Sequence, residues 1–239
     1  MKVLAIDTST LTASAAVVED GRVLAAGESG INTHSAQLLH LIDDALATAS
    51  TDLASIDAVA IGAGPGSFTG LRIGMATAKG LCFATGKPLW AVSSLAALAL
   101  DGATSQTRPL VVVPVLDAAR SEIFAGFYRI DPAGTAHSLA PDQVLAPDLL
   151  AEVVSGLGIE DPLVCGDTAV RYRDAMAGAG VFSEASRTTP SAASVGKLAL
   201  LGERVDVFET AAPVYIRPSE AEIKYPDGNT GGAFRPKST

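Results

Sequence analysis

The stretch KVLAIDTST, residues 2–10, decides the fold. Its first five residues are mostly apolar, a pattern typical of a buried strand, and Asp7 ends that strand. An antiparallel hairpin follows, because ASAAVV (13–18) and RVLAAGES (22–29) flank a turn centred on Asp20-Gly21. Further along, the sequence predicts a helix over 35–49, with its N-cap at Asn32 or Thr33. Two strands and two helices then alternate: a strand over 57–62, a helix over 68–84, a strand over 88–92 and a helix over 93–100.

The same order of elements begins again after a polar linker at 101–109. LVVVPVLD (110–117) is a strand that also ends in an aspartate, Asp117, and EIFAGFYRID (122–131) pairs with it. A weaker third strand near 137–144, a helix over 147–156, a strand over 162–166 and a helix near 170–178 complete this half.

Two β-β-β-α-β-α halves, the second abbreviated, resemble the actin-like (ribonuclease H-like) ATPase fold. That resemblance implies an α/β fold in which Asp7 and Asp117 face each other across a cleft. We expect residues 1–104, completed by a helix at about 191–204, to form the first subdomain and 105–190 the second. Residues 205–225 are then a C-terminal segment, and 226–239 are a flexible tail because they are polar and rich in Pro, Gly and Asn.

Composition narrows the class of protein. The 239 residues are 48% hydrophobic, which is enough for an ordinary core, and the formal net charge is −9. A chain this acidic is a poor unaided binder of nucleic acid, whose phosphates dominate affinity. The two cysteines suggest no disulfide framework, the N-terminus has too short an apolar run for a signal peptide, and no run of 18 apolar residues predicts a membrane span. The expected location is the cytoplasm.

A glycine-rich stretch, GAGPGSFTGLRIG (62–74), raises the question of phosphate binding. The spacing matches neither the Walker loop, which needs Gly-Lys-Ser/Thr, nor the dinucleotide fingerprint G-x-G-x-x-G. Gly66, Gly70, Gly74 and Ala78 instead recur every four residues, so they share one face of the helix that follows. The pattern therefore predicts a turn that leads into a helix with one face of small residues.

The helix over 68–84 carries only two charges, Arg72 and Lys79. A helix that is apolar nearly all round is covered on more than one side. A neighbouring helix of the same domain explains this as well as a partner protein does. On the partner interpretation, the face with Gly70, Gly74 and Ala78 allows another helix to approach closely, although a crossing inside the domain could use the same face.

The polar stretch DTST (7–10) is a candidate nucleotide site. A carboxylate and three hydroxyls at a strand end are able to hold magnesium and phosphate, but the same residues also form a capped tight turn. Neither this stretch nor LDAARSE (116–122) has the glycines usual in actin-like kinases. We therefore interpret Asp7, Thr8, Ser9 and Asp117 as a candidate vestigial nucleotide cleft, with Asp7 structural rather than catalytic.

No metal site is predicted from the three histidines. His34 and His40 are six residues apart and point away from each other on a helix, whereas a helical metal pair needs a spacing of three or four. Cys82 lies between Leu81 and Phe83, which favours core packing over a nucleophilic role.

Six motifs together resemble the bacterial TsaB family, also called YeaZ, over residues 1 to about 218. The motifs are LAIDTST (4–10), THSAQLL (33–39), GAGPGSFTGLRIG (62–74), AKGL (78–81), LDAARSEIF (116–124) and PVYIRP (213–218). The resemblance implies a subunit of the machinery that makes threonylcarbamoyladenosine in tRNAs decoding ANN codons. Its implied partners are the catalytic subunit TsaD and the ATPase TsaE, with a homodimer when the chain is alone.

The resemblance also implies where partners bind. The helices of the first half form the TsaB–TsaD interface, and tRNA is contacted mainly through the other subunits. TsaD carries a His-x-x-x-His metal site, but here His34 is followed by Leu38, so no metal or cofactor is expected for the isolated chain. ATP or ADP with Mg²⁺ in the complex is left open. The interface residues expected on this basis are Leu41, Gly70, Arg72, Ile73, Gly74, Thr77 and Ala78.

Three alternatives stay open at this point. An actin-like small-molecule kinase would need a competent nucleotide cleft. A metallopeptidase of the M22 glycoprotease type would need metal ligands. A scaffold unrelated to tRNA would associate with some other partner.

Overall fold

A computed structural model describes residues 1–29, 35–103, 110–183, 188–202 and 205–216. Several features expected from the sequence lie outside these ranges. They are the predicted N-cap at Asn32 or Thr33, the residue His34, most of the predicted linker and the predicted tail. No helix within them is long and apolar enough to cross a membrane.

The first half is a five-stranded mixed sheet in the order β3-β2-β1-β4-β5. Strand β1 (Lys2–Asp7) pairs antiparallel with β2 (Ala13–Glu19), which pairs antiparallel with β3 (Arg22–Ser29). On its other side β1 pairs in parallel with β4 (Ala58–Gly62), and β4 with β5 (Leu89–Val92). The predicted hairpin around Asp20-Gly21 is confirmed, since both residues have the positive φ that such a turn requires.

The second half repeats this arrangement, which confirms the predicted duplicated actin-like fold. Its sheet has the order β10-β9-β6-β7-β8, the same order as the first sheet when read from β8. Strands β6 (Leu110–Asp117), β7 (Ile123–Ile130) and β8 (Ala136–Leu145) form the antiparallel part. Strands β9 (Leu163–Cys165) and β10 (Val181–Phe182) add the parallel part.

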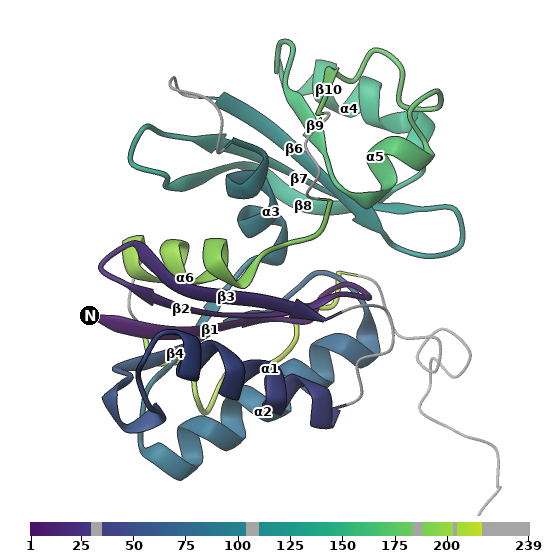
Figure 1. Cartoon of the computed structure of the whole chain (residues 1–239). Coiled ribbons are helices and arrows are strands. Elements are labelled where there is room, and N and C mark those ends of the chain that lie inside the picture. Colours follow the sequence, from purple (N-terminus) through teal and green to yellow (C-terminus); the bar gives the residue numbers. More distant parts are fainter. Residues whose placement is uncertain (30–34, 104–109, 184–187, 203–204, 217–239) are drawn as a thin grey trace, which may run out of the picture.

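Helices cover both faces of the first sheet, and β1, β2 and β4 are therefore buried on both sides. Leu4 and Ile6 face α1 (Ser35–Thr48) and α2 (Phe68–Thr85). Val3 and Ala5 face α6 (Ala192–Leu201), which packs on α3 (Ser94–Ala103). Figure 1 shows α1 and α2 below the first sheet and α3 between the two sheets. Helix α3 also packs on residues of β6 and β7, so one apolar core joins the halves.

The second half differs from the prediction in its helices. The helix expected near 170–178 is the short α5 (Asp167–Arg171), followed by turns, and β10 was not predicted. Gly178 and Gly180, which follow these turns, have positive φ, a backbone conformation that glycine adopts readily. The helix expected over 147–156 is split into a 3-10 turn (Pro147–Leu149) and α4 (Leu150–Gly156).

The segment 205–216 after α6 returns to the first half. The Val207 amide donates to the Leu89 carbonyl at 2.9 Å, and the Asp206 carboxylate accepts the Leu89 amide at 3.0 Å. The Val214 amide then donates to the Ala63 carbonyl at 2.7 Å. This segment therefore runs from the free side of β5 to the glycine turn that precedes α2.

Candidate functional site at the glycine turn

The glycine turn packs against the backbone that follows β1. A Cβ on Gly66 would lie 2.1 Å from the Ser9 carbonyl oxygen, and one on Gly70 would lie 2.1 Å from the Thr8 carbonyl oxygen. The Ser67 amide donates to the Ser9 carbonyl at 2.6 Å. The bare backbone thus serves a close contact between two segments of this chain. In a phosphate-binding loop the Ser67 amide would be free to donate to the phosphate. Here it donates to the Ser9 carbonyl instead.

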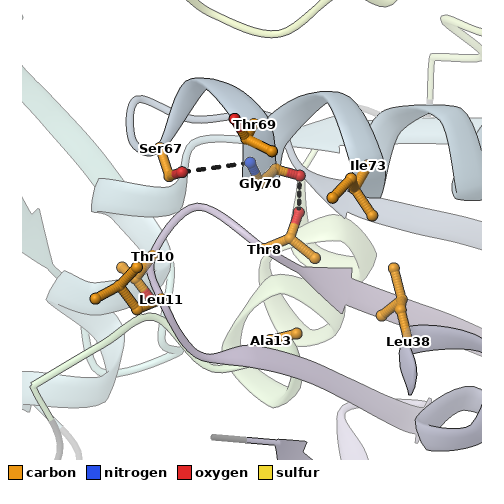
Figure 2. A pocket seen from close by; sticks show the side chains of 9 residues that line it. All are labelled: Thr8, Thr10, Leu11, Ala13, Leu38, Ser67, Thr69, Gly70 and Ile73. Atoms are coloured by element: carbon orange, nitrogen blue, oxygen red, sulfur yellow. Dashed lines mark hydrogen bonds between the residues drawn. The ribbon is translucent and has the colours of Figure 1, made fainter. Parts of the chain in front are cut away.

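The first turn of α2 also has internal partners for its polar groups. Ser67 is the N-cap, and its hydroxyl accepts the Gly70 amide at 3.3 Å. The Thr8 hydroxyl donates to the Gly70 carbonyl at 2.8 Å (Figure 2). Two side chains from different elements therefore fix Gly70 and, with it, the start of the helix.

Asp7 connects β1, the glycine turn and α3. Its side chain is fully buried and accepts hydrogen bonds from the Ser9 amide at 2.9 Å, the Ser9 hydroxyl at 2.7 Å and the Ser94 hydroxyl at 2.7 Å. Ser94 in turn accepts the Gly64 amide at 3.2 Å. Burial raises the pKa of the Asp7 carboxyl to about 6, and the hydrogen bonds from Ser9 and Ser94 oppose that rise.

Gly62 is required by the same carboxylate. A Cβ at this position would lie 1.8 Å from Oδ2 of Asp7 and 2.8 Å from the Ser94 hydroxyl oxygen. The Asp7 carboxylate is thus enclosed by groups of this chain, and its role as more structural than catalytic stays a prediction.

The second-half aspartate, Asp117, has a different environment. Its carboxylate accepts the Ala119 amide at 2.8 Å and lies 3.6 Å from the Arg171 guanidinium, and its side chain is 45% exposed. The described contacts of Asp7 and Asp117 share no residue. The candidate cleft residues thus fall into a buried group (Asp7, Thr8 and Ser9) and an exposed one (Asp117).

Sequence reasoning did not identify Asp167 and Thr168. Oδ1 of Asp167 and the Thr168 hydroxyl are buried without a hydrogen-bond partner in the described residues. Burial raises the pKa of Asp167 to about 6, and the nearby charge of Asp117 adds to the rise. The pair follows Gly166, at the end of β9. A Gly-Asp sequence directly after a predicted strand was the one feature of the sequence that pointed to a polar site here.

The structure corrects the predicted partner face of α2. A Cβ on Gly74 would lie 2.2 Å from the Thr8 hydroxyl oxygen and 3.2 Å from Cδ1 of Ile61, and Ala78 is fully buried. Gly74 and Ala78 therefore face the interior of this chain, whereas the half-buried Gly70 contacts the turn after β1. The spacing correctly identified residues that share one face of the helix. That face packs inside this chain, which was the alternative to packing on a partner.

Other faces of α2 remain open. Arg72 and Ala76 are exposed, Ile73 and Thr77 are half-buried, and Phe83 is 83% exposed near the end of the helix. On α1, the half-buried Leu41 packs on β3, since a Cβ on Gly27 would lie 2.9 Å from its Cδ1.

A small pocket of about 170 Å³ lies beside the first two turns of α2. Figure 2 shows its lining, which comes from the turn after β1, from the start of β2, from α1 and from the start of α2. The lining is mostly methyl groups of aliphatic and threonine side chains. The lining residues are Thr8, Thr10, Leu11, Ala13, Leu38, Ser67, Thr69, Gly70 and Ile73.

Metal chemistry has no evident ligand set in the described ranges. No group of three or more His, Cys, Asp or Glu side chains there is arranged to hold a metal ion. Cys82 is buried in the core, and burial raises the pKa of its thiol to about 11, so little of the reactive thiolate forms at neutral pH.

The duplicated sheets define the class of protein: an actin-like fold in which the turn after the first strand is closed by the chain's own backbone. The family model of TsaD, tRNA N6-adenosine threonylcarbamoyltransferase, matches residues 28–163. The tRNA threonylcarbamoyladenosine biosynthesis protein TsaB of Escherichia coli is 34% identical over 95% of this chain and 99% of its own length. The TsaB protein of Bacillus subtilis is 29% identical over 94% of this chain and 98% of its own.

A solved structure agrees with these relatives. YeaZ from Pseudomonas aeruginosa has a TM-score of 0.77 and 33% identity, and the match covers 90% of this chain and 99% of that one. The chain belongs to the TsaB (YeaZ) family.

The contacts of α2 predict opposite outcomes for two glycines on one helix. Gly74→Ala should lower the free energy of unfolding by about 1–3 kcal/mol, because the new methyl overpacks the contact with Thr8. Gly80→Ala meets nothing within 4 Å and should raise stability by up to about 1 kcal/mol through helix propensity. Urea unfolding of both variants is the measurement, and a Gly74→Ala protein as stable as wild type would contradict the internal packing.

Asp7→Asn tests the buried carboxylate. At pH 7 the variant should be less stable by about 1 kcal/mol, because one accepted hydrogen bond is lost. Wild-type Asp7 has a raised pKa when folded, so the folded state takes up a proton as the pH falls through about 6, before the unfolded chain does. Between pH 7 and 5 wild type should therefore gain about 1 kcal/mol relative to Asp7→Asn. Equal pH dependence of the two unfolding free energies would refute the assignment.

Proposed function

We propose that this chain is a non-catalytic subunit of the complex that forms N6-threonylcarbamoyladenosine at position 37 of tRNAs reading ANN codons. It acts by binding a TsaD-type catalytic subunit. Membership of the TsaB family supports the pathway. The single observation that supports docking is the exposed, nearly uncharged surface of α2, on which Phe83 is 83% exposed.

The arrangement around Asp7 supports a role without catalysis. The carboxylate already accepts three hydrogen bonds from Ser9 and Ser94, and the Ser67 amide is taken by the Ser9 carbonyl. These groups would have to exchange partners before they contacted a nucleotide. The same observations count against the small-molecule kinase alternative.

The similarity of this chain to the TsaD family model favours a twofold arrangement of the chain with its catalytic partner. The TsaD model matches 28–163, which includes α1 and α2, so partner and chain share this region of the fold. Two chains with the same fold associate readily about an approximate twofold axis through equivalent surfaces. A homodimer through the same surface then follows when the partner is missing. The residues proposed for this surface are Leu41, Arg72, Ile73, Thr77 and Phe83.

The remaining partners are part of the same proposal. A TsaE-type ATPase joins the complex, and tRNA is contacted mainly through the other subunits, in keeping with the net charge of −9. This proposal places the chain in the cytoplasm.

Reconstitution with the TsaD-type subunit of the same organism tests the proposal. We expect the two chains to co-elute on a sizing column, and threonylcarbamoyladenosine in tRNA, measured by mass spectrometry, to depend on this chain. A catalytic subunit that neither binds the chain nor needs it would refute the proposal.

A matched pair of variants locates the surface. Phe83→Asp puts a charge into the contact and should weaken binding at least tenfold, because a charge buried without a partner is costly. Val170→Asp changes another exposed apolar residue, 73% exposed on α5 in the second half, and should leave binding unchanged. The opposite ranking of the two variants would move the interface away from α2.

A further inference from the structure

Three exposed side chains hold each other in place at the start of α2. The Arg72 guanidinium lies over the Phe68 ring, 3.8 Å from its centroid, and its Nε donates to the Tyr215 hydroxyl at 3.1 Å. The rings of Phe68 and Tyr215 are 5.1 Å apart between centroids. We call Phe68, Arg72 and Tyr215 the aromatic cluster. Phe68 and Tyr215 remain 38% and 41% exposed, so the cluster forms part of the surface.

The C-terminal segment makes this cluster rigid. Tyr215 follows Val214, whose amide is bonded to Ala63 at 2.7 Å, and the segment is also tied to Leu89 through Val207. Tyr215 is thus presented by a backbone that is fixed at two points. A side chain ordered before binding loses less conformational entropy when a partner arrives.

Arg72 has hydrogen-bonding capacity that no described residue uses. Its described contacts are the Tyr215 hydroxyl and the Phe68 ring, and neither is a carboxylate. Guanidinium carries five N–H donors in a planar fork, of which Nε–H is used here. The terminal nitrogens therefore have the geometry to bind a carboxylate with two parallel hydrogen bonds.

The pocket lies on the adjacent row of the same helix. Thr69 and Ile73 line it, and they neighbour Phe68 and Arg72, so one element lying across α2 can contact both rows. Three of its four hydroxyls are engaged: Thr8 with Gly70, Ser67 with Gly70, and Thr10 with Thr12. The hydroxyl of the exposed Thr69 is the fourth. A volume of about 170 Å³ with a mostly apolar lining suits one aliphatic side chain better than a phosphate.

We propose that this surface is the anchor point for the catalytic subunit. A helix of that subunit places one Leu-, Ile- or Met-sized side chain in the pocket and one Asp or Glu carboxylate on Arg72. An apolar anchor in a pocket, next to an arginine and two aromatic rings, is the usual composition of an interface hot spot. The inference rests on the proposed function and adds the chemistry of the partner's contact. Tyr215 is a positioning residue, because it acts by holding Arg72.

Binding of the purified TsaD-type subunit to the full chain, measured by calorimetry at two salt concentrations, tests this inference. Arg72→Glu should weaken binding at least a hundredfold and Arg72→Lys about tenfold, because lysine keeps the charge but loses the planar fork. Thr69→Phe, which fills the pocket from its mouth, should weaken binding at least tenfold. Tyr215→Phe, which removes only the hydroxyl, should weaken it a few-fold and leave the thermal melt unchanged.

The matched control is Arg129→Glu, the same charge change at an exposed position on β7 in the second half, which should alter binding by less than threefold. A series of single Asp or Glu to Arg changes in the partner should contain one that restores binding to Arg72→Glu.

If wild type does not bind the subunit, the proposed function fails. If wild type and Arg72→Glu bind equally well, only this inference is overturned. The inference is likewise overturned if Arg72→Glu loses affinity for tRNA while binding the subunit normally, because Arg72 would then be a phosphate contact.

Discussion

The contact between the backbone after β1 and the glycine turn before α2 determines how the rest of this chain is arranged. The Ser67 amide binds the Ser9 carbonyl at 2.6 Å, and the Thr8 hydroxyl binds the Gly70 carbonyl at 2.8 Å. Both contacts need glycine, because a Cβ at Gly66 or Gly70 would collide with a carbonyl oxygen. They set the position of α2 on the sheet, and with it which residues of α2 reach the surface.

This closed turn supports the proposal that the chain is a non-catalytic subunit. In α/β folds, ligands bind beyond the carboxyl ends of parallel strands. Here the end of β1 is occupied by Asp7, Ser9 and Ser94, which satisfy one another. In the described part of the first half, groups open to a partner lie on the outer side of α2, together with Tyr215 from the C-terminal segment. That distribution supports the proposed interaction surface.

Much of the fold was predictable from local pattern. Two apolar strands that end in Asp7 and Asp117, each followed by a hairpin, were enough to predict the duplication, because strand pairing follows from alternation and turn chemistry. The face of Gly70, Gly74 and Ala78 was not predictable, since spacing groups residues without saying what they contact. The pairing of Tyr215 with Arg72 joins positions 143 residues apart, and no periodicity reports such a contact. Asp167 and Thr168 were missed because their burial depends on the packing of α5 against β6.

Amide resonances of the glycine turn test the central claim most directly. In the isolated chain the Ser67 amide should exchange slowly with solvent, because it is bonded to the Ser9 carbonyl. Addition of millimolar Mg-ATP should leave the resonances of Gly66, Ser67 and Gly70 unchanged. Fast exchange of Ser67, with shifts of these three amides on addition of Mg-ATP, would show that the turn is open and binds phosphate, and would contradict this account.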